Sequence, residues 1–408
     1  MTCQSKAPLP GSFRRLAWSN LAAQSAEQIA LAAAPLVAVA SFGAGAAETG
    51  LLQTVLTLPF VILAVPAGLL ADRVRKSRLM AGAEMVRAFA LAALVLLLWR
   101  GGLTFGSLAA LGFVAVCGTV VFSVAAPALV PSLVDAPALP LANARIELAR
   151  TVAFAGGPAL GGALVGFVGA APAFAGAAAL SFAATALLAG IGEAAPGRRG
   201  ARRPLDEIRE GLGFVFRHPL LAPVFATQTI FNIGMFMILG IFVPHAVSTL
   251  GLSPQGVGLA LGCYGLGMVV GALAAPRIIG ELRFGTVIGI GPLTGLAASV
   301  VMASSHIWPV PALAALSLFL FGIGPILWVV STATLRQSVT PPDLLGRVSA
   351  ANILSYGARP AGSALCAGIA ALAGKGAVLW SAVALFGLQA AIILLSAVTR
   401  LERQPGIA

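Results

Sequence analysis

Charged residues are scarce in this chain. They make up 9% of its 408 residues, whereas hydrophobic residues make up 59%. A soluble domain carries about 25% charged residues, so this chain has too few to cover a surface that faces water. The mean hydropathy of +0.98 agrees. This composition excludes a soluble domain and predicts an integral membrane protein.

Residues that bind metals or perform catalysis are also scarce, with four cysteines and three histidines in the whole chain. The cysteines have no close pairwise spacing, and a free cysteine inside a span behaves as a small hydrophobe. The histidines fall at the ends of predicted spans, without a histidine–acid constellation or a Gly-x-Ser-x-Gly motif. We therefore predict no disulfide, no metal, no cofactor and no enzymatic activity.

Stretches without charge define the membrane spans. Residues 151–192 contain no charged residue, and residues 218–276 contain none apart from histidines. A spanning helix needs about 20 apolar residues, so the second stretch holds at least two. Apolar runs bounded by charges, Gly and Pro predict twelve helices, at 16–42, 48–71, 77–99, 103–130, 141–168, 170–191, 219–249, 254–279, 284–304, 308–335, 347–372 and 376–399.

The distribution of cations predicts the orientation. Of the 25 Lys and Arg residues, 19 lie on the side of the two termini, and only Arg100 and Lys375 lie on the opposite side. The positive-inside rule then places both termini in the cytoplasm. The net charge of +12 is thus a signal of topology, and we expect no nucleic-acid partner. The polar, basic start of the chain, residues 1–15, lacks the pattern of a cleavable signal.

One long polar stretch divides the chain. Residues 193–218 begin as a basic linker and continue as an amphipathic helix after Pro204, with Leu205, Ile208, Leu212 and Val215 on one face. We expect this helix to lie flat on the cytoplasmic membrane surface. The predicted parts are an N-terminal six-helix bundle at 1–192, a cytoplasmic linker at 193–218 and a C-terminal six-helix bundle at 219–408.

The two halves resemble each other at an offset of about 203 residues. The segment from Gly68 to Arg73 corresponds to the segment from Gly271 to Arg277, and Pro158 and Pro360 are each followed by a glycine eight residues later. These matches indicate an internal duplication, and hence two pseudo-symmetric six-helix bundles.

The segment Gly68-Leu-Leu-Ala-Asp72-Arg73-Val-Arg75-Lys76-Ser-Arg78 resembles the signature of the major facilitator superfamily between helices 2 and 3. Gly68, Asp72, Arg73 and Lys76 match it, whereas Arg75 and Ser77 depart from it. Stretches at 127–143, 210–219 and 346–362 are similar to the bacterial enterobactin, macrolide and multidrug exporters. The resemblance implies an all-α transporter with the major facilitator fold. It also implies a latch in which Asp72 faces the start of helix 11 near Arg347.

The energy source of transport limits which residues are candidates for coupling. The chain has no Gly-x-x-x-x-Gly-Lys-Ser/Thr motif, so ATP does not drive transport. Ionisable residues inside a membrane are rare and usually functional. Asn20, Gln24, Glu27 and Gln28 form one polar stripe on the first helix, and superfamily relatives carry a helix-1 acid that lines the central cavity. Glu27 is therefore the proton-coupling candidate, with a hydrogen-bonded structural glutamate as the alternative.

The seventh helix occupies the matching place in the second half. Its amides and its adaptable apolar side chains, together with two aromatic residues of the tenth helix, predict the rest of the cavity wall, although they are equally compatible with ordinary packing. These residues are Gln228, Asn232, Met235, Phe236, Phe319 and Trp328.

Six further charges were predicted inside or near the bundle. Glu84 and Arg87 are three residues apart, as in an internal ion pair. Arg145, Glu147 and Arg150 begin the fifth helix and are expected to gate or stabilise its cytoplasmic end. Arg359 needs an acid or a carbonyl as partner, with Glu27 among the alternatives.

These observations predict a secondary active transporter in a bacterial inner membrane, with proton-coupled efflux of small amphipathic molecules by alternating access. An importer or a lysolipid flippase on the same fold is the alternative, because no motif encodes direction. The expected partners are a small-molecule substrate, protons and the lipid bilayer, and the expected state is a monomer.

Overall fold

The computed structural model describes residues 10–135, 138–192, 204–341, 344–345, 347–348 and 354–405, and all regular elements within them are helical. The first half comprises α1 (Gly11–Phe42), α2 (Ala46–Thr57), α3 (Pro59–Ile62), α4 (Ala64–Arg73), α5 (Lys76–Trp99), α6 (Phe105–Leu129), α7 (Leu139–Val168) and α8 (Ala170–Ala189). The second half comprises α10 (Leu221–Ser248), α11 (Pro254–Glu281), α12 (Phe284–Ile307), α13 (Pro311–Val339) and α15 (Arg359–Leu394), with α9 (Pro204–Arg217) between the halves.

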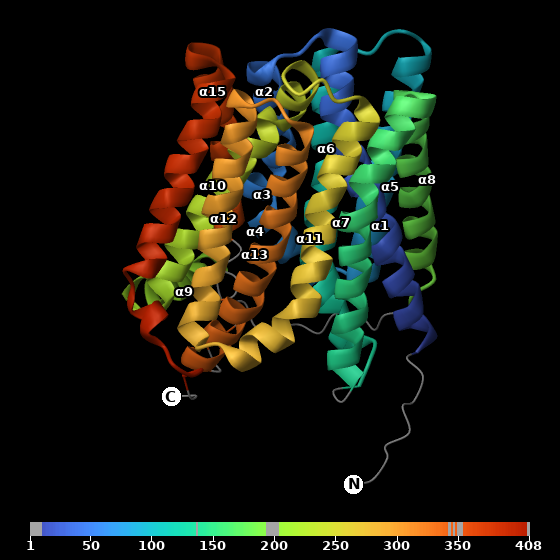
Figure 1. The fold of residues 1–408 in the computed structure, drawn as a ribbon. Helices are drawn as coiled ribbons and strands as arrows, with labels where there is room; N and C mark the ends of the chain where they lie inside the picture. Colours follow the sequence, from blue (N-terminus) through green and yellow to red (C-terminus); the bar gives the residue numbers. More distant parts are fainter. Residues whose placement is uncertain are drawn as a thin grey trace.

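The chain is an all-α polytopic membrane protein with twelve spans in two six-helix bundles. Within the described residues, ten helices are long and apolar enough to cross a membrane. The short helices α2, α3 and α4 together make one further span, and α15 makes two. In Figure 1 the two bundles stand side by side, with both termini at the same end.

The second span differs from its prediction. A single helix was expected at 48–71, but the chain forms α2, α3 and α4 in succession. Pro59 begins α3, and Pro66 lies in the first turn of α4. A proline has no N–H to donate to the preceding turn, so each proline interrupts the helical hydrogen bonding and a helix restarts around it.

The last two spans were predicted as separate helices at 347–372 and 376–399, and the structure joins them across a break. Gly374 has φ 79° and ψ −177° inside α15, a conformation that glycine adopts without steric cost. The second part of α15 ends at Leu394, before a short 3₁₀ turn over Ala397–Arg400. At the other end, Leu354–Ala358 form a 3₁₀ turn, and the α-helix starts only at Arg359.

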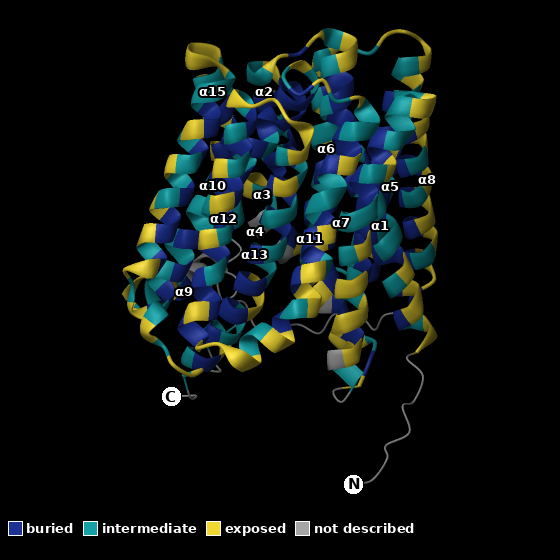
Figure 2. Ribbon diagram, in the orientation of Figure 1, coloured by how far each residue is buried: buried dark blue, intermediate teal, exposed yellow. Residues whose placement is uncertain are grey.

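Apolar side chains are exposed around the outside of the bundles, as a protein in lipid requires. Buried residues gather where helices meet, and exposed residues lie along the outer faces (Figure 2). Phe167, Leu273 and Leu372 are 79%, 77% and 90% exposed. A water-soluble monomer seldom exposes such large continuous apolar surfaces, so the outer faces contact lipid.

The halves meet through small residues. A Cβ added to Gly162 of α7 would lie 2.5 Å from the Cα of Gly258 in α11, and one added to Gly50 of α2 would lie 3.0 Å from the Cα of Ala367 in α15. Gly162 lies near the end of α7, Gly258 near the start of α11 and Gly50 near the start of α2, and these helix ends lie opposite the termini (Figure 1). Small residues let helix backbones approach closely in membranes, so they close this end of the interface.

The helix α9 does not have the surroundings that its amphipathic pattern predicted. Val215 is buried in a cluster with Leu221 and Val348, and Leu212 packs against that cluster. This part of the apolar face therefore packs on protein and not on lipid, because Leu221 at the start of α10 and Val348 before α15 cover it. The side chains of Leu205 and Ile208 lie outside the described residues.

Candidate functional site

A cavity of about 240 Å³ lies between the halves at the middle of the bundles. Its wall is contributed by α1, α2, α3, α6 and α7 from the first half and by α10, α11, α13 and α15 from the second. Most of the wall is apolar or aromatic, and it carries one acid, Glu27, and one base, Arg359.

Glu27 projects from the middle of α1, where Gln28 and Leu31 also line the cavity. Within the described part of the chain, the Glu27 carboxylate makes no hydrogen bond or ion pair. The same side chain also borders a smaller internal cavity of about 30 Å³, whose wall includes Arg87 and Thr119. The geometry therefore does not support the alternative interpretation of Glu27 as a hydrogen-bonded structural glutamate.

Arg359 lies across the cavity at the start of α15. Its guanidinium carbon is 4.5 Å from the centroid of the Tyr356 ring, and it also contacts the rings of Phe60 and Phe236 at 4.9 and 5.2 Å. Tyr356 belongs to the 3₁₀ turn just before α15, and side chains three residues apart stack in that geometry. Cation–π contact with three rings stabilises the guanidinium without neutralising its charge.

Asn232 orients Arg359. The Arg359 Nε donates to the Asn232 Oδ1 at 3.2 Å, and the Asn232 Nδ2 donates to the Gln228 backbone carbonyl at 2.9 Å. Because Gln228 and Asn232 are four residues apart on α10, the second bond turns the Asn232 oxygen toward α15. Glu27 was one of the partners considered for Arg359, but no ion pair joins the two among the described residues.

The structure brings five of the predicted side chains other than Glu27 to the cavity, namely Gln28, Asn232, Met235, Phe236 and Arg359. Asn20 was predicted with them, but it is buried and donates to the Ile146 carbonyl at 3.2 Å, joining α1 to α7. Gln24 and Gln228 are half-buried outside the described cavity wall.

Phe319 and Trp328 of α13 also lie outside this wall. Phe319 packs beside Gly267 of α11, and Trp328 is buried against Gly291 of α12. The contact of Phe319 with Gly267 is made by its backbone carbonyl, whereas the Trp328 side chain faces α12 of its own half, and Leu318 is the residue of α13 that lines the cavity. Their prediction as cavity residues was therefore wrong.

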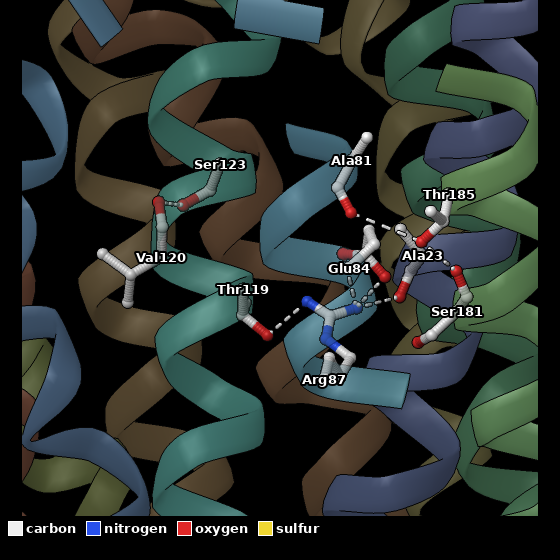
Figure 3. A network of polar contacts seen from close by, with 9 residues as sticks. All are labelled: Ala23, Ala81, Glu84, Arg87, Thr119, Val120, Ser123, Ser181 and Thr185. Carbon is white, nitrogen blue, oxygen red and sulfur yellow. Dashed lines mark hydrogen bonds and ion pairs between the residues drawn. The ribbon is translucent and has the colours of Figure 1, made fainter. Parts of the chain in front are cut away.

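The ion pair predicted between Glu84 and Arg87 is confirmed. The Arg87 Nη1 lies 3.1 Å from the Glu84 Oε1, and both side chains are buried. Arg87 also donates to the Ala23 carbonyl of α1 at 2.8 Å and to the Thr119 hydroxyl of α6 at 2.6 Å. Figure 3 shows how the Arg87 guanidinium thus joins α5 to α1 and α6.

The charges at the start of α7 are less buried than expected. Arg145 and Glu147 are exposed, because they lie in the first turns of α7, where few helices surround it. Arg150 is half-buried over the Phe154 ring at 5.4 Å, and its Nε donates to both carboxylate oxygens of Glu147 at 3.0 Å.

Only part of the predicted latch is described. The surroundings of Gly68 and the side chain of Asp72 lie outside what the structure describes, and Arg73 is exposed at the end of α4. Lys76 begins α5. The Arg347 Nη1 lies 2.7 Å from the Glu210 Oε1 of α9. Arg347 thus pairs with the helix between the halves, and its contact with Asp72 stays a prediction.

Several cavity residues were missed in the sequence. These are Gln53 and Thr57 of α2, Phe60 of α3, Phe154 of α7 and Tyr264 of α11. The chain has only two tyrosines, and both lie near this site, Tyr264 in the wall and Tyr356 against Arg359. Their rarity in so apolar a chain is the signal that could have identified them.

Twelve spans in two bundles around a central cavity define a membrane transporter fold. The sequence model described as Major Facilitator Superfamily matches residues 16–359. This chain belongs to that superfamily.

Solved structures agree with this fold. A bacterial homologue of the iron transporter ferroportin, inward-facing, has a TM-score of 0.71 and 15% identity over 94% of this chain and 98% of that chain. A bacterial homologue of the human lysosomal transporter Spinster has a TM-score of 0.69 and 13% identity over 95% and 96%. A mutant of the peptide transporter POT has a TM-score of 0.75 and 13% identity over 97% and 96%. A comparison with curated protein sequences found no match.

Proposed function

We propose that this protein is a secondary active transporter that exports small amphipathic molecules in exchange for protons. One observation carries the proposal. The Glu27 carboxylate is open to a central, largely apolar cavity and has no protein partner among the described residues. An ionisable group in that position is a functional group by default.

The chemistry of exchange follows from the environment of Glu27. Removing a carboxylate from water disfavours its charged form, and a nearby cation favours it. A bound cationic group of the cargo therefore favours the ionised form of Glu27, and its departure allows the carboxylate to take up a proton. Proton and cargo then compete for one site, which is the requirement for antiport.

Alternating access uses the contacts between the halves. The approach of Gly162 to Gly258 and of Gly50 to Ala367 closes the end opposite the termini. Rocking of one bundle against the other would open this end and close the other around a site at the membrane midplane. We further propose that Asp72 and Arg347 contribute to closure at the end that carries the termini.

The proposed location is the bacterial inner membrane, with both termini cytoplasmic. The cation distribution supports this orientation. Reporters fused after residues 44, 102 and 251 are expected in the periplasm, and those after residues 76, 200 and 340 in the cytoplasm. A periplasmic reporter at residue 200 would contradict both the orientation and the predicted linker.

The proposal is tested by uptake into inverted membrane vesicles with an acidic interior. The probes are naphthyl compounds that carry an amine, a carboxylate or both groups, and uptake by vesicles without the protein is subtracted. Export by antiport predicts uptake that disappears when the pH gradient is collapsed. No gradient-dependent uptake of any probe contradicts proton coupling, and gradient-driven uptake only into right-side-out vesicles indicates an importer.

A further inference from the structure

The central cavity contains one acid and one base that do not pair with each other. Glu27 belongs to the first half and Arg359 to the second, and within the described residues no ion pair joins them. A buried charge without a partner is costly. The same chain pairs another buried arginine, Arg87, with a carboxylate and two oxygen acceptors. The absence of pairing in the cavity is therefore a property of this site.

The geometry of Arg359 leaves one side of its guanidinium free. Asn232 accepts only from Nε, and the rings of Tyr356, Phe60 and Phe236 contact the group through their π systems. Among the described residues, neither Nη nitrogen donates a hydrogen bond. Two parallel N–H groups in this arrangement match the oxygens of a carboxylate or a phosphate.

We propose that the cargo is an amphipathic zwitterion, with a cationic amine bound at Glu27, an anionic group bound at Arg359 and an apolar body against the aromatic wall. This inference rests on the proposed function and adds the substrate class. The amine and the anionic group of the cargo would then be the ion-pair partners that Glu27 and Arg359 do not find in each other.

Singly charged molecules fit the cavity less well. A simple cation would pair with Glu27 but leave the Arg359 charge in the same low-dielectric space. A simple anion would pair with Arg359 and would bind best with Glu27 protonated, so anion and proton would travel together, as in symport. Only a cargo with both charges neutralises the cavity and also displaces the proton from Glu27.

Binding to the purified full-length protein tests the inference without requiring transport. The probes are 2-naphthylalanine, 2-naphthylethylamine and 2-naphthylpropionic acid, which share one aromatic body and differ in charge. Because a charge-assisted hydrogen bond forms only with the matching group, we expect the parent to bind the amino acid at least about tenfold more tightly than either other probe.

Two variants separate the charges. Arg359→Gln should lose the preference for the amino acid over the amine while binding the amine no more weakly than the parent. Glu27→Gln should lose the preference over the acid while binding the acid no more weakly. Retained binding of one probe shows that each variant is folded. Arg359→Lys keeps the charge and should keep part of the preference.

Arg277→Gln is the matched control, because Arg277 pairs with Glu281 near the end of α11, is exposed and does not line the cavity. It should bind all three probes as the parent does. The inference is overturned if the parent does not prefer the amino acid, or if Arg359→Gln keeps the full preference. Gradient-driven uptake without that preference would overturn this inference alone, whereas absence of such uptake would overturn the proposed function.

Discussion

The buried pair in the first bundle and the two cavity charges illustrate opposite uses of charge within one membrane protein. Glu84 and Arg87 lie 3.1 Å apart, and Arg87 joins α5 to α1 and α6. Glu27 and Arg359 line the central cavity on opposite halves and make no ion pair with each other among the described residues.

The difference shows which charges stabilise the fold and which are available to a ligand. A buried pair persists because each charge compensates the desolvation of the other. The cavity charges remain accessible because aromatic contacts and a single hydrogen bond orient Arg359 without neutralising it. The two groups of charges are neighbours in the first bundle, because Glu27 and Arg87 both border the same small internal cavity of about 30 Å³.

The largest expected effect comes from breaking the buried pair. Arg87→Leu leaves the Glu84 charge buried without a partner, which should destabilise the protein by about 3–5 kcal/mol. Thermal unfolding in detergent and the yield of monodisperse protein measure it. The control is the double variant Arg87→Leu/Glu84→Gln, which should recover most of the lost stability. A single variant as stable as the parent would mean that the pair is not structural.

Removing the acid from the cavity should leave the fold intact and abolish coupling. Glu27→Gln keeps the shape but cannot change charge, and among the described residues Glu27 has no hydrogen-bond or ion-pair partner to lose. We expect gradient-driven accumulation to disappear, with an unfolding temperature equal to that of the parent. If this variant accumulates cargo as well as the parent, the proton site lies elsewhere, with Glu147 and Glu84 as the next candidates.

A charge at the end of the second span should have a moderate effect on turnover. Asp72→Asn removes a proposed charge–dipole contact that exists in only one conformation. Such contacts contribute about 0.3–1 kcal/mol when exposed and up to ~2 when partly buried, enough to shift a balanced equilibrium severalfold. Transport rate at matched protein level measures it, and unchanged turnover would identify Asp72 as a solvated acid.

The exposed pair on α7 should contribute least. Glu147 is 55% exposed in its pair with Arg150, and exposed ion pairs typically contribute about 0.2–1 kcal/mol. Glu147→Gln should therefore change the unfolding temperature by a few degrees at most, measured beside Arg87→Leu. If Glu147→Gln lowered the unfolding temperature as much as Arg87→Leu, exposure would not explain the difference between the Glu147–Arg150 and Glu84–Arg87 pairs.

Much of the fold was predictable because each helix that spans the bilayer needs about 20 apolar residues. Spans such as 170–191 and 254–279 agree with α8 and α11 within a few residues. The exceptions have local causes. Proline restarts the helix in the second span, and an amphipathic pattern such as that of α9 does not specify whether lipid or protein covers its apolar face.

The candidate site was predictable only in part. Glu27 and Arg359 stood out because charge at membrane depth is rare. The position of the seventh helix predicted Phe236 and Met235 as cavity residues, but periodicity could not distinguish a helix face in contact with the cavity from one in contact with a neighbouring helix. Trp328 shows this limit, because it lies against Gly291 of α12.

The sequence by itself determined the class of protein, the number of spans and the presence of ionisable groups at membrane depth, since hydropathy and charge act locally along the chain. The spacing of Glu84 and Arg87 also predicted their ion pair, whereas only the tertiary structure decided that Glu27 and Arg359 make no ion pair with each other among the described residues. Arg87 has Glu84 one turn away on the same helix. By contrast, the surroundings of Arg359 include residues distant in sequence, Asn232 of α10 and Phe60 of α3, beside the nearby Tyr356, and only helix packing brings them together. Pairing depends on distances across the bundle, and those distances exist only once the helices have packed.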